Sequence, residues 1–487
     1  SIPPIAARIK SEKAKLSNQI IANRAAQGTE RLLSLPRRGT PAVEVLSELR
    51  KRAARDVQLL RDGESPLSGA VYMPARGLHR ALLDDVHRLF SLTNPLHPDA
   101  FPSVRQMEAE VVAVTAGLLG GGLGGANPNV CGAMTSGGTE SILSAVKASR
   151  DYMAQRKGIR KPEMIIGVSA HAAYWKAAEY FKIKLHVVPV GRDFRLSAAA
   201  VRRRMNRNTV LVVASAPGFP HGVVDDVQGI ARLAASSGVC CHVDACLGGF
   251  CLPFVRKLGR RVPPFDFRVR GVTSMSVDTH KFGMAHKGTS VVLYSCRELR
   301  THQYTRVTDW SGGLYISPGL AGSRPGALIA SAWASLVHLG EEGLMAATSA
   351  ILAARDTLVQ GIANQIPELE VLGEPEMGVV AFRSTVREVD IFVLNDWLTA
   401  NGGWHLNALQ APPALHFCFT AMNADMAGPL VGALKRGVAE LKAMKPAEAK
   451  AAATRGSAPI YGLANTTVDR DLVGEFLVAF QDVMLMP

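Results

Sequence analysis

The sequence predicts an α/β protein whose mostly parallel sheet is covered by helices on both faces, followed by a smaller α+β domain. Two observations lead to this prediction. Between about residues 105 and 295, short apolar runs typical of buried strands alternate with segments of helical spacing. From about residue 346 the pattern changes to a helix, short strands and a final helix over 470–484. The expected domains are an N-terminal helical arm (1–102), a large α/β domain (103–345) and a small C-terminal domain (346–487).

The elements of the large domain follow one another in a regular order. A helix over 105–119 precedes the first strand, 129–134, and the next helix runs to about residue 157. Sites in parallel sheets lie at the carboxyl ends of the strands, so functional residues are expected there. The further strands are expected at 164–169, 185–190, 209–216, 239–245, 272–278 and 289–295, and the helices between them at 172–182, 197–206 and 226–237.

Charge is unevenly distributed along the chain. The 487 residues carry a formal net charge of +14, and residues 1–62 contain 13 Lys and Arg against 6 Asp and Glu, which is half of that excess. This basic segment is either a solvated helical arm or a segment that lies next to an anionic membrane surface. No recognition motif accompanies the charge, so no nucleic-acid partner is expected. No apolar run has the length and continuity of a membrane span.

Cysteine usage indicates the redox compartment. The number of cysteines is odd, and most lie in apolar or Gly-rich runs, which is typical of reduced, mostly buried thiols in a cytosol-facing protein. Four of them gather around His242, but C-x-x-C spacing is missing, so no metal site is expected. The seven are Cys131, Cys240, Cys241, Cys246, Cys251, Cys296 and Cys418.

The stretch TSGGTES, residues 135–141, lies between a predicted strand and a predicted helix. Glycines let the backbone approach a ligand closely, and the free amides and the dipole at a helix start favour a phosphate. Thr139 is placed to cap the helix and to donate to an oxyanion. An ordinary structural turn has the same composition, so this motif alone is weak.

Two further motifs end apolar strands. HVDA (242–245) places Asp244 where a carboxylate is costly unless a cation pairs with it. SVDTHKFGMAHKG (276–288) places Lys281 at the end of a later apolar run, which makes its amine a candidate Schiff-base former. Taken alone, Asp244 is equally a capping residue and Lys281 a surface lysine.

Together, the three motifs match what pyridoxal 5'-phosphate (PLP) needs. The glycine turn holds the cofactor phosphate, the aspartate pairs with the pyridine nitrogen, and the lysine binds the aldehyde as an imine. His171, in SAHAAYWKAA (169–178), follows another strand and is a candidate to cover the face of the ring. As a lone histidine it also fits a helix cap. PLP is therefore the expected cofactor.

Longer stretches of the chain resemble the sphingosine-1-phosphate lyases, in the group II decarboxylase-like branch of the fold-type I PLP enzymes. HVDA and THK are shared with the amino-acid decarboxylases, whereas NPLHPD (94–99) and AGSRPG (321–326) are much more specific to the lyases. The resemblance covers nearly the whole chain from about residue 65 and implies the fold-type I architecture. Other matching stretches are TSGGTESIL (135–143), FPHGVVD (219–225), FDFRVRGVTSMSVDTHKFG (265–283), TDWSGGLY (308–315) and IYGLANTTVDR (460–470).

The resemblance assigns roles to individual residues. It implies that Lys281 carries the cofactor, that Asp244 pairs with the pyridine nitrogen and that His171 stacks on the ring. The implied cup for the cofactor phosphate consists of Gly137, Gly138, Thr139 and His280, completed by Gly322 and Ser323 of the neighbouring subunit in a homodimer with shared sites. The residues implied to hold the substrate phosphate are Tyr72, His97 and Lys287.

This chain departs from the family in the loop after Lys281. The lyases usually have THKYGYAPKG where this chain has THKFGMAHKG. Phe282 and Met284 thus replace two tyrosines, and His286 replaces a proline. This loop therefore offers no phenolic hydroxyl, and Tyr461 is a candidate to supply one.

The implied reaction cleaves the C2–C3 bond of a phosphorylated long-chain base to phosphoethanolamine and a long-chain aldehyde. The base that takes the proton of the C3 hydroxyl is left open among Tyr461, His171, the freed Lys281 and a phosphate oxygen. The alternative is an amino-acid decarboxylase on the same fold, which would have less use for both His97 and Lys287. Membership also implies a location at the endoplasmic reticulum membrane, facing the cytosol, if an anchor precedes residue 1, and a cytoplasmic location otherwise.

Overall fold

The computed structural model describes residues 32–56, 66–74 and 76–445, with the short stretches 447–448, 452, 474–475, 477–478 and 481–482. The chain forms two compact units, and the fold described below is that of Leu60–Leu409 with Pro413–Ala443. In the other unit, helix α2 (Ala42–Asp56) is exposed over its described side chains. Tyr461 and most of the predicted final helix lie outside the described residues.

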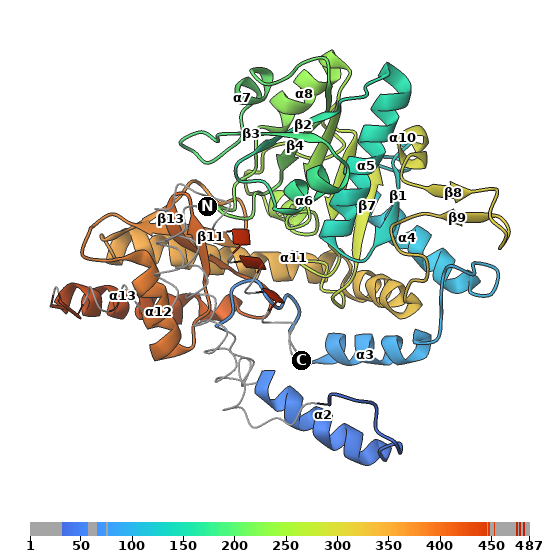
Figure 1. The fold of residues 1–487 in the computed structure, drawn as a ribbon. Coiled ribbons are helices and arrows are strands. Elements are labelled where there is room, and N and C mark those ends of the chain that lie inside the picture. The colour runs from blue at the N-terminus through green and yellow to red at the C-terminus, as the bar shows by residue number, and fades with distance from the viewer. Residues whose placement is uncertain are drawn as a thin grey trace, which may run out of the picture. The chain divides into compact units, whose positions relative to one another are not determined.

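A seven-stranded sheet forms the centre of the large domain (Figure 1). The strand order is β1-β7-β6-β5-β4-β2-β3. Strand β7 is antiparallel to both of its neighbours, and the other neighbouring pairs are parallel. The predicted mostly parallel sheet is therefore confirmed. The strands are β1 (Cys131–Thr135), β2 (Glu163–Gly167), β3 (Lys184–Val188), β4 (Thr209–Ser215), β5 (Cys240–Asp244), β6 (Ser274–Val277) and β7 (Ser290–Tyr294).

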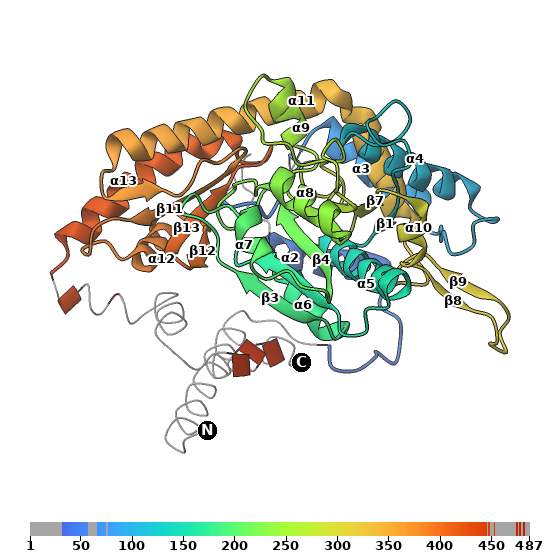
Figure 2. The ribbon, with the colours of Figure 1, turned by 90° about the horizontal axis from the view of Figure 1, so that it is seen from above.

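Helices cover both faces of this sheet (Figure 2). Apolar side chains of α5 and α6 pack on strands β2, β4 and β7 in one buried cluster, which explains why those strands are apolar throughout. Polar caps begin several helices: the Asp226 side chain accepts a hydrogen bond from Gly229 N at the start of α8. The helices of this domain are α3 (Leu78–Phe90), α4 (Pro102–Leu118), α5 (Gly138–Lys157), α6 (Ala173–Tyr180), α7 (Ala198–Arg202), α8 (Val227–Ser237), α9 (Leu252–Lys257) and α10 (Arg297–Thr301).

Helix α11 (Gly326–Gln365) connects the two sheets (Figure 2). It packs on α3 and α4 and, further along, on α13 and on strands β10 and β11 of a four-stranded sheet of order β10-β11-β13-β12. In this sheet, β11 is antiparallel to both β10 and β13. The kink of α11 is at Gly340, with φ 56° and ψ −167°. The helix runs through residue 345, and the three predicted domain ranges remain predictions. The remaining elements are β8 (Thr305–Val307), β9 (Tyr315–Ser317), β10 (Leu369–Val371), β11 (Val379–Ser384), α12 (Ile391–Gly402), β12 (Asn407–Gln410), β13 (Pro413–Cys418), a 3-10 turn (Ala424–Met426) and α13 (Ala427–Ala443).

The seven cysteines are free thiols, as the sequence predicts for a reduced protein. Burial raises the pKa of Cys240 to about 11, so this thiol is protonated at neutral pH. Across the described residues, none of the helices combines the length and the apolar composition that a membrane crossing requires.

We expect the folded protein to lose measurable stability in mild acid because of His416 on β13. It is fully buried, its Nδ1 donates to Pro220 O at 3.0 Å, and burial lowers its pKa from 6.5 to about 4. Below pH 6.5, His416 becomes protonated in the unfolded chain but stays neutral in the folded protein. The free energy of unfolding therefore falls as the pH decreases. Between pH 7.5 and 5.5 this amounts to about 1.3 kcal/mol.

The check is urea unfolding of the wild type and His416→Gln at both pH values. Glutamine keeps a donor for Pro220 but does not titrate, so the advantage of the wild type should shrink by about 1.3 kcal/mol at pH 5.5. Burial raises the pKa of Asp225 to about 7, and its contribution to the pH dependence of stability has the opposite sign. This contribution is the same in the wild type and the variant, so it cancels when the two are compared. If the difference in unfolding free energy between the wild type and His416→Gln is the same at both pH values, His416 is not the source of the pH dependence.

Candidate active site

The turn before α5 lies at the carboxyl end of β1. Gly137 is the N-cap of the helix and has φ 154°, a conformation that favours glycine. A Cβ at Gly138 would lie 2.8 Å from Cys246 Sγ and 3.0 Å from both carboxylate oxygens of Asp278, so only glycine fits there. Thr139 is exposed and, contrary to the expectation, does not cap the helix with its side chain. Gly138 therefore lies close to the residues that follow β5 and β6.

Asp244 is the last residue of β5 and is buried. Its Oδ1 accepts hydrogen bonds from Cys246 N at 3.1 Å and from Ser276 Oγ at 3.2 Å. Burial by itself raises the pKa of this carboxyl, but His171 and Lys281 nearby lower it, and the net result is a pKa below the ordinary value. Asp244 is thus held as a carboxylate beside two cationic or cation-forming side chains.

Lys281 follows β6, and its Nζ lies 2.8 Å from Asp278 Oδ2. Burial alone lowers the pKa of this amine, but the negative charge of Asp278, with smaller contributions from Cys246 and Asp244, raises the pKa above its ordinary value. Lys281 is therefore an ammonium ion paired with Asp278. Asp278 is not among the site residues predicted from the sequence, although its place directly after an apolar strand is a signal for one.

Two histidines border the same space. His280 Nδ1 donates to Thr289 O at 2.6 Å, and its Cε1 is the atom that a Cβ on Gly137 would approach, at 3.8 Å. Burial lowers the pKa of His280, so the neutral ring is favoured. His171 is exposed, accepts a hydrogen bond from Ala173 N at 3.1 Å, and lies near enough to Asp244 to lower the pKa of that carboxyl. The hydrogen bond to the start of α6 and the predicted position of His171 over the face of the cofactor ring are compatible with each other.

Tyr72 and Lys287 lie together, as the resemblance implies. The Lys287 ammonium is 4.7 Å from the centroid of the Tyr72 ring, a cation–π contact. Burial, followed by the charge of Lys281, lowers the pKa of Lys287. Phe282 packs edge-on against Tyr72 at 5.1 Å, which gives this unusual phenylalanine a packing role. His97 is exposed, and no contact joins it to this pair within the described chain.

The other two unusual loop residues are accommodated by local contacts. Met284 is buried with φ 53°, a left-handed conformation. His286 lies where the family usually has a proline, and its Nδ1 is 3.0 Å from Ser331 Oγ while its Nε2 is 3.5 Å from Asp84 Oδ1. These contacts tie the loop between Lys281 and Lys287 to α3 and α11.

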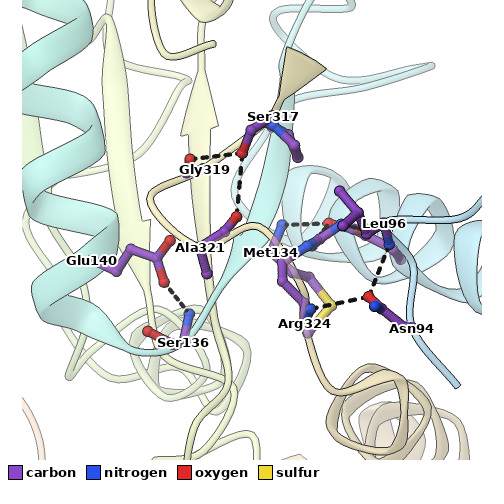
Figure 3. A network of polar contacts seen from close by, with 12 residues as sticks. Asn94, Leu96, Met134, Ser136, Glu140, Ser317, Gly319, Ala321 and Arg324 are labelled. Carbon is purple, nitrogen blue, oxygen red and sulfur yellow. Dashed lines mark hydrogen bonds and ion pairs between the residues drawn. The ribbon is translucent and has the colours of Figure 1, made fainter. Parts of the chain in front are cut away.

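The segment AGSRPG is anchored within its own chain (Figure 3). Arg324 makes a bidentate ion pair with Glu108, at 2.6 and 2.9 Å. Asn94 Nδ2 donates to Ser323 Oγ at 3.0 Å, and Asn94 Oδ1 accepts from Arg324 N at 3.2 Å. Leu320 N donates to Glu140, whose other oxygen accepts from Ser136 N at 2.7 Å. The segment therefore lies beside the glycine turn of its own chain, with Ser323 exposed and Gly322 partly exposed.

The site thus collects side chains from the ends of β1, β2, β5 and β6. The structure brings Lys281, Asp244, His171 and the glycine turn together, and their roles stay predictions; Tyr461 lies outside the described residues. In the part of the chain that the structure describes, no group of three or more His, Cys, Asp or Glu side chains is arranged to hold a metal ion.

Comparisons with known proteins agree with this geometry. Residues 35–385 match the pyridoxal-dependent decarboxylase conserved domain. Sphingosine-1-phosphate lyase of Arabidopsis thaliana is 48% identical over 484 residues, covering 99% of this chain and 86% of that protein. The chain belongs to the sphingosine-1-phosphate lyase family. Within this lyase family, sphingosine-1-phosphate lyase 1 of Rattus norvegicus is 41% identical, covering 99% of this chain and 82% of that protein.

Solved structures support the family and the fold. The sphingosine-1-phosphate lyase of Burkholderia pseudomallei has a TM-score of 0.81 and 39% identity, covering 91% of this chain and 99% of that chain. A glutamate decarboxylase of Lactobacillus brevis has a TM-score of 0.72 at 18% identity, covering 86% and 97%, which shows a shared fold only. The predicted fold-type I architecture and the resemblance to the lyases are both confirmed.

Proposed function

We propose that this protein is a PLP-dependent carbon–carbon lyase that cleaves a phosphorylated long-chain base between C2 and C3, giving phosphoethanolamine and a long-chain aldehyde. The observation that carries the proposal is the pair of lysines six residues apart on one loop, of which Lys281 is partly buried and Lys287 is exposed. Lys281 lies among Asp244, Asp278 and the glycine turn, and Lys287 is a second cation on the same loop. Membership of the lyase family supports the same reaction.

The residues present fit PLP. A turn whose second glycine has no room for a Cβ suits close approach of a phosphate to backbone amides. Asp278 Oδ1 is buried without a hydrogen-bond partner among the described residues, which suits a site that gains a polar group. Lys281 would hold the aldehyde carbon, Asp244 the ring nitrogen and His171 one face of the ring. Once bound, the cofactor supplies an electron sink for the bond that breaks.

His280 would join the phosphate cup as a cation. Its Nδ1–H is committed to Thr289 O, so the ring can donate to a phosphate only through a protonated Nε2. A phosphate dianion nearby would raise the pKa of His280 and favour that form. Thr139, exposed on the first turn of α5, is free to add a hydroxyl donor.

Lys287, Tyr72 and His97 would hold the substrate phosphate. Lys287 is a partly desolvated cation lying on the Tyr72 ring, so its position is set before substrate arrives. Phosphate bound there fixes one end of the substrate and orients the amine-bearing carbon toward Lys281. An amino-acid decarboxylase, the alternative, has no phosphate to place against Lys287.

Proton transfer is the task of the side chains around Lys281. Asp278 favours the ammonium form of Lys281. Lys281 is therefore suited to return a proton to C2 after cleavage. Removal of the C3 hydroxyl proton needs a base, for which Tyr461, His171, the freed Lys281 and a phosphate oxygen remain candidates. Mass spectrometry of the products tests the reaction: a fatty aldehyde supports the lyase, and carbon dioxide supports the decarboxylase.

Lys287→Ala is expected to lower kcat/KM for the phosphorylated base about ten- to hundredfold. A charge-assisted bond to phosphate in a partly dry site contributes roughly 1.5–3 kcal/mol. The measurement is steady-state kinetics with the cofactor content of each preparation. The cofactor content of Lys287→Ala should equal that of the wild type. It should also equal that of Lys176→Ala, the control variant, which replaces an exposed lysine of α6. Loss of cofactor from Lys287→Ala would show that Lys287 serves the cofactor phosphate.

The functional molecule would be a homodimer with shared sites. Ser323 is exposed and Gly322 is partly exposed within an anchored segment, which suits a contribution to the phosphate cup of a second subunit. The basic residues of segment 1–62 would add contact with an anionic membrane surface, in keeping with a location at the endoplasmic reticulum.

A further inference from the structure

His242 is a buried residue that the proposed reaction does not use. It lies on β5 two residues before Asp244 and is fully buried. Side chains two apart on a strand share a face, so His242 and Asp244 point to the same side of the sheet. The parallel register places Ser274 opposite His242 and Ser276 opposite Asp244. Four polar side chains therefore form one row inside the protein.

Hydrogen bonds connect the row from end to end. His242 Nδ1 is 2.9 Å from Ser274 Oγ, and Nε2 is 3.1 Å from Ser276 Oγ. Ser276 Oγ is 3.2 Å from Asp244 Oδ1. Tyr174, also fully buried, covers the row with its ring edge-on to His242 at 6.2 Å between centroids.

The direction of each bond follows from the donors available. A carboxylate only accepts, so the single hydroxyl hydrogen of Ser276 goes to Asp244, and Ser276 must accept from His242 Nε2–H. Burial lowers the pKa of His242 to about 4, so the ring is neutral and carries one N–H. Its Nδ1 therefore accepts from Ser274. The chain runs one way, from Ser274 through His242 and Ser276 to Asp244.

We propose that His242 and Ser276 are positioning residues that hold Asp244 as a carboxylate aimed at the ring nitrogen of the cofactor. The hydrogen bonds from Ser276 Oγ and Cys246 N both end on Oδ1 of this carboxylate, and the buried hydroxyl of Tyr174 lies close to Asp244 and Ser276. Oδ2 is left to pair with a protonated ring nitrogen. Because each bond in the chain polarises the next toward Asp244, the row favours the charged form of that carboxyl. This inference rests on the proposed PLP chemistry.

Binding of PLP to the apoprotein, measured by fluorescence titration, tests the proposal without any turnover. Ser276→Ala removes a hydrogen bond to a buried carboxylate, so the Kd should rise about ten- to hundredfold. Ser276→Thr keeps the hydroxyl and should restore most of the affinity. Ser149→Ala removes another fully buried serine, on α5, and should leave the Kd unchanged. His242→Gln, a second way to break the chain, should raise the Kd as well.

A double-mutant cycle with Asp244→Asn separates an effect through Asp244 from a general loss of packing. On the Asp244→Asn background, Ser276→Ala should change the Kd less than twofold, because the charge it supports is gone. An equal loss on both backgrounds, or wild-type affinity in Ser276→Ala, would overturn the proposal. If the wild-type apoprotein itself does not bind PLP, the proposed function fails instead.

Discussion

Lys281→Ala is expected to lose essentially all lyase activity, a decrease on the order of a thousandfold or more. Lys281 is the amine that lies close to Asp244, Asp278 and the glycine turn, whereas Lys287 lies on the Tyr72 ring. Without this amine the cofactor would be held by its phosphate and ring contacts alone. The cofactor content of purified Lys281→Ala should therefore be lower than that of the wild type as well.

Covalent labelling makes this prediction specific to the residue. Wild-type protein incubated with PLP and reduced with borohydride should carry the cofactor on the peptide that contains Lys281. Lys287→Ala should be labelled like the wild type. Lys281→Arg is the matched control for folding, since it keeps a cation for Asp278 but forms no imine; it should be stable, unlabelled and inactive. Label on Lys287 in the wild type would show that the two lysines have been assigned the wrong way round.

A refolded mixture of Lys281→Ala and Ser323→Asp is expected to regain about a quarter of the wild-type activity. Ser323→Asp alone should be nearly inactive, because it sets a negative charge against the cofactor phosphate of the second subunit. Unfolding and refolding the two variants together should give mixed dimers in about half of the population. In each mixed dimer, one of the two sites combines an intact Lys281 with an intact Ser323 from the other chain.

The opposite outcome is equally clear. If Lys281 and Ser323 of one chain serve the same site, both sites of a mixed dimer carry one lesion, and no activity returns. The bond from Asn94 to Ser323 and the ion pair of Arg324 with Glu108 lie within one chain, so the substitution at Ser323 leaves the Arg324 anchor in place. Refolded wild type and each variant refolded alone provide the controls.

Local patterns predicted most of the large domain. The apolar runs that became β2, β4 and β5 are buried on both faces, and such runs between helices leave few alternatives to a parallel sheet. The glycine turn, Asp244 and Lys281 each follow an apolar strand, and strand ends of one sheet meet at one edge, so chain order alone brings them together. This reasoning did not select Asp278, three residues before Lys281, although it also directly follows an apolar strand, because the sequence does not show which acidic residue meets the lysine.

Local sequence determined the fold class, the glycine turn and the residues that end the strands, because periodicity and turn chemistry act over a few residues. The tertiary structure alone decided which side chains meet across elements: Lys281 with Asp278, Lys287 with Tyr72 from a segment more than 200 residues away, and Ser276 with both His242 and Asp244. Such pairings depend on the register between strands and on packing between distant segments. Neither leaves a periodic signal in the chain, so the protonation states they set appear only in the folded protein.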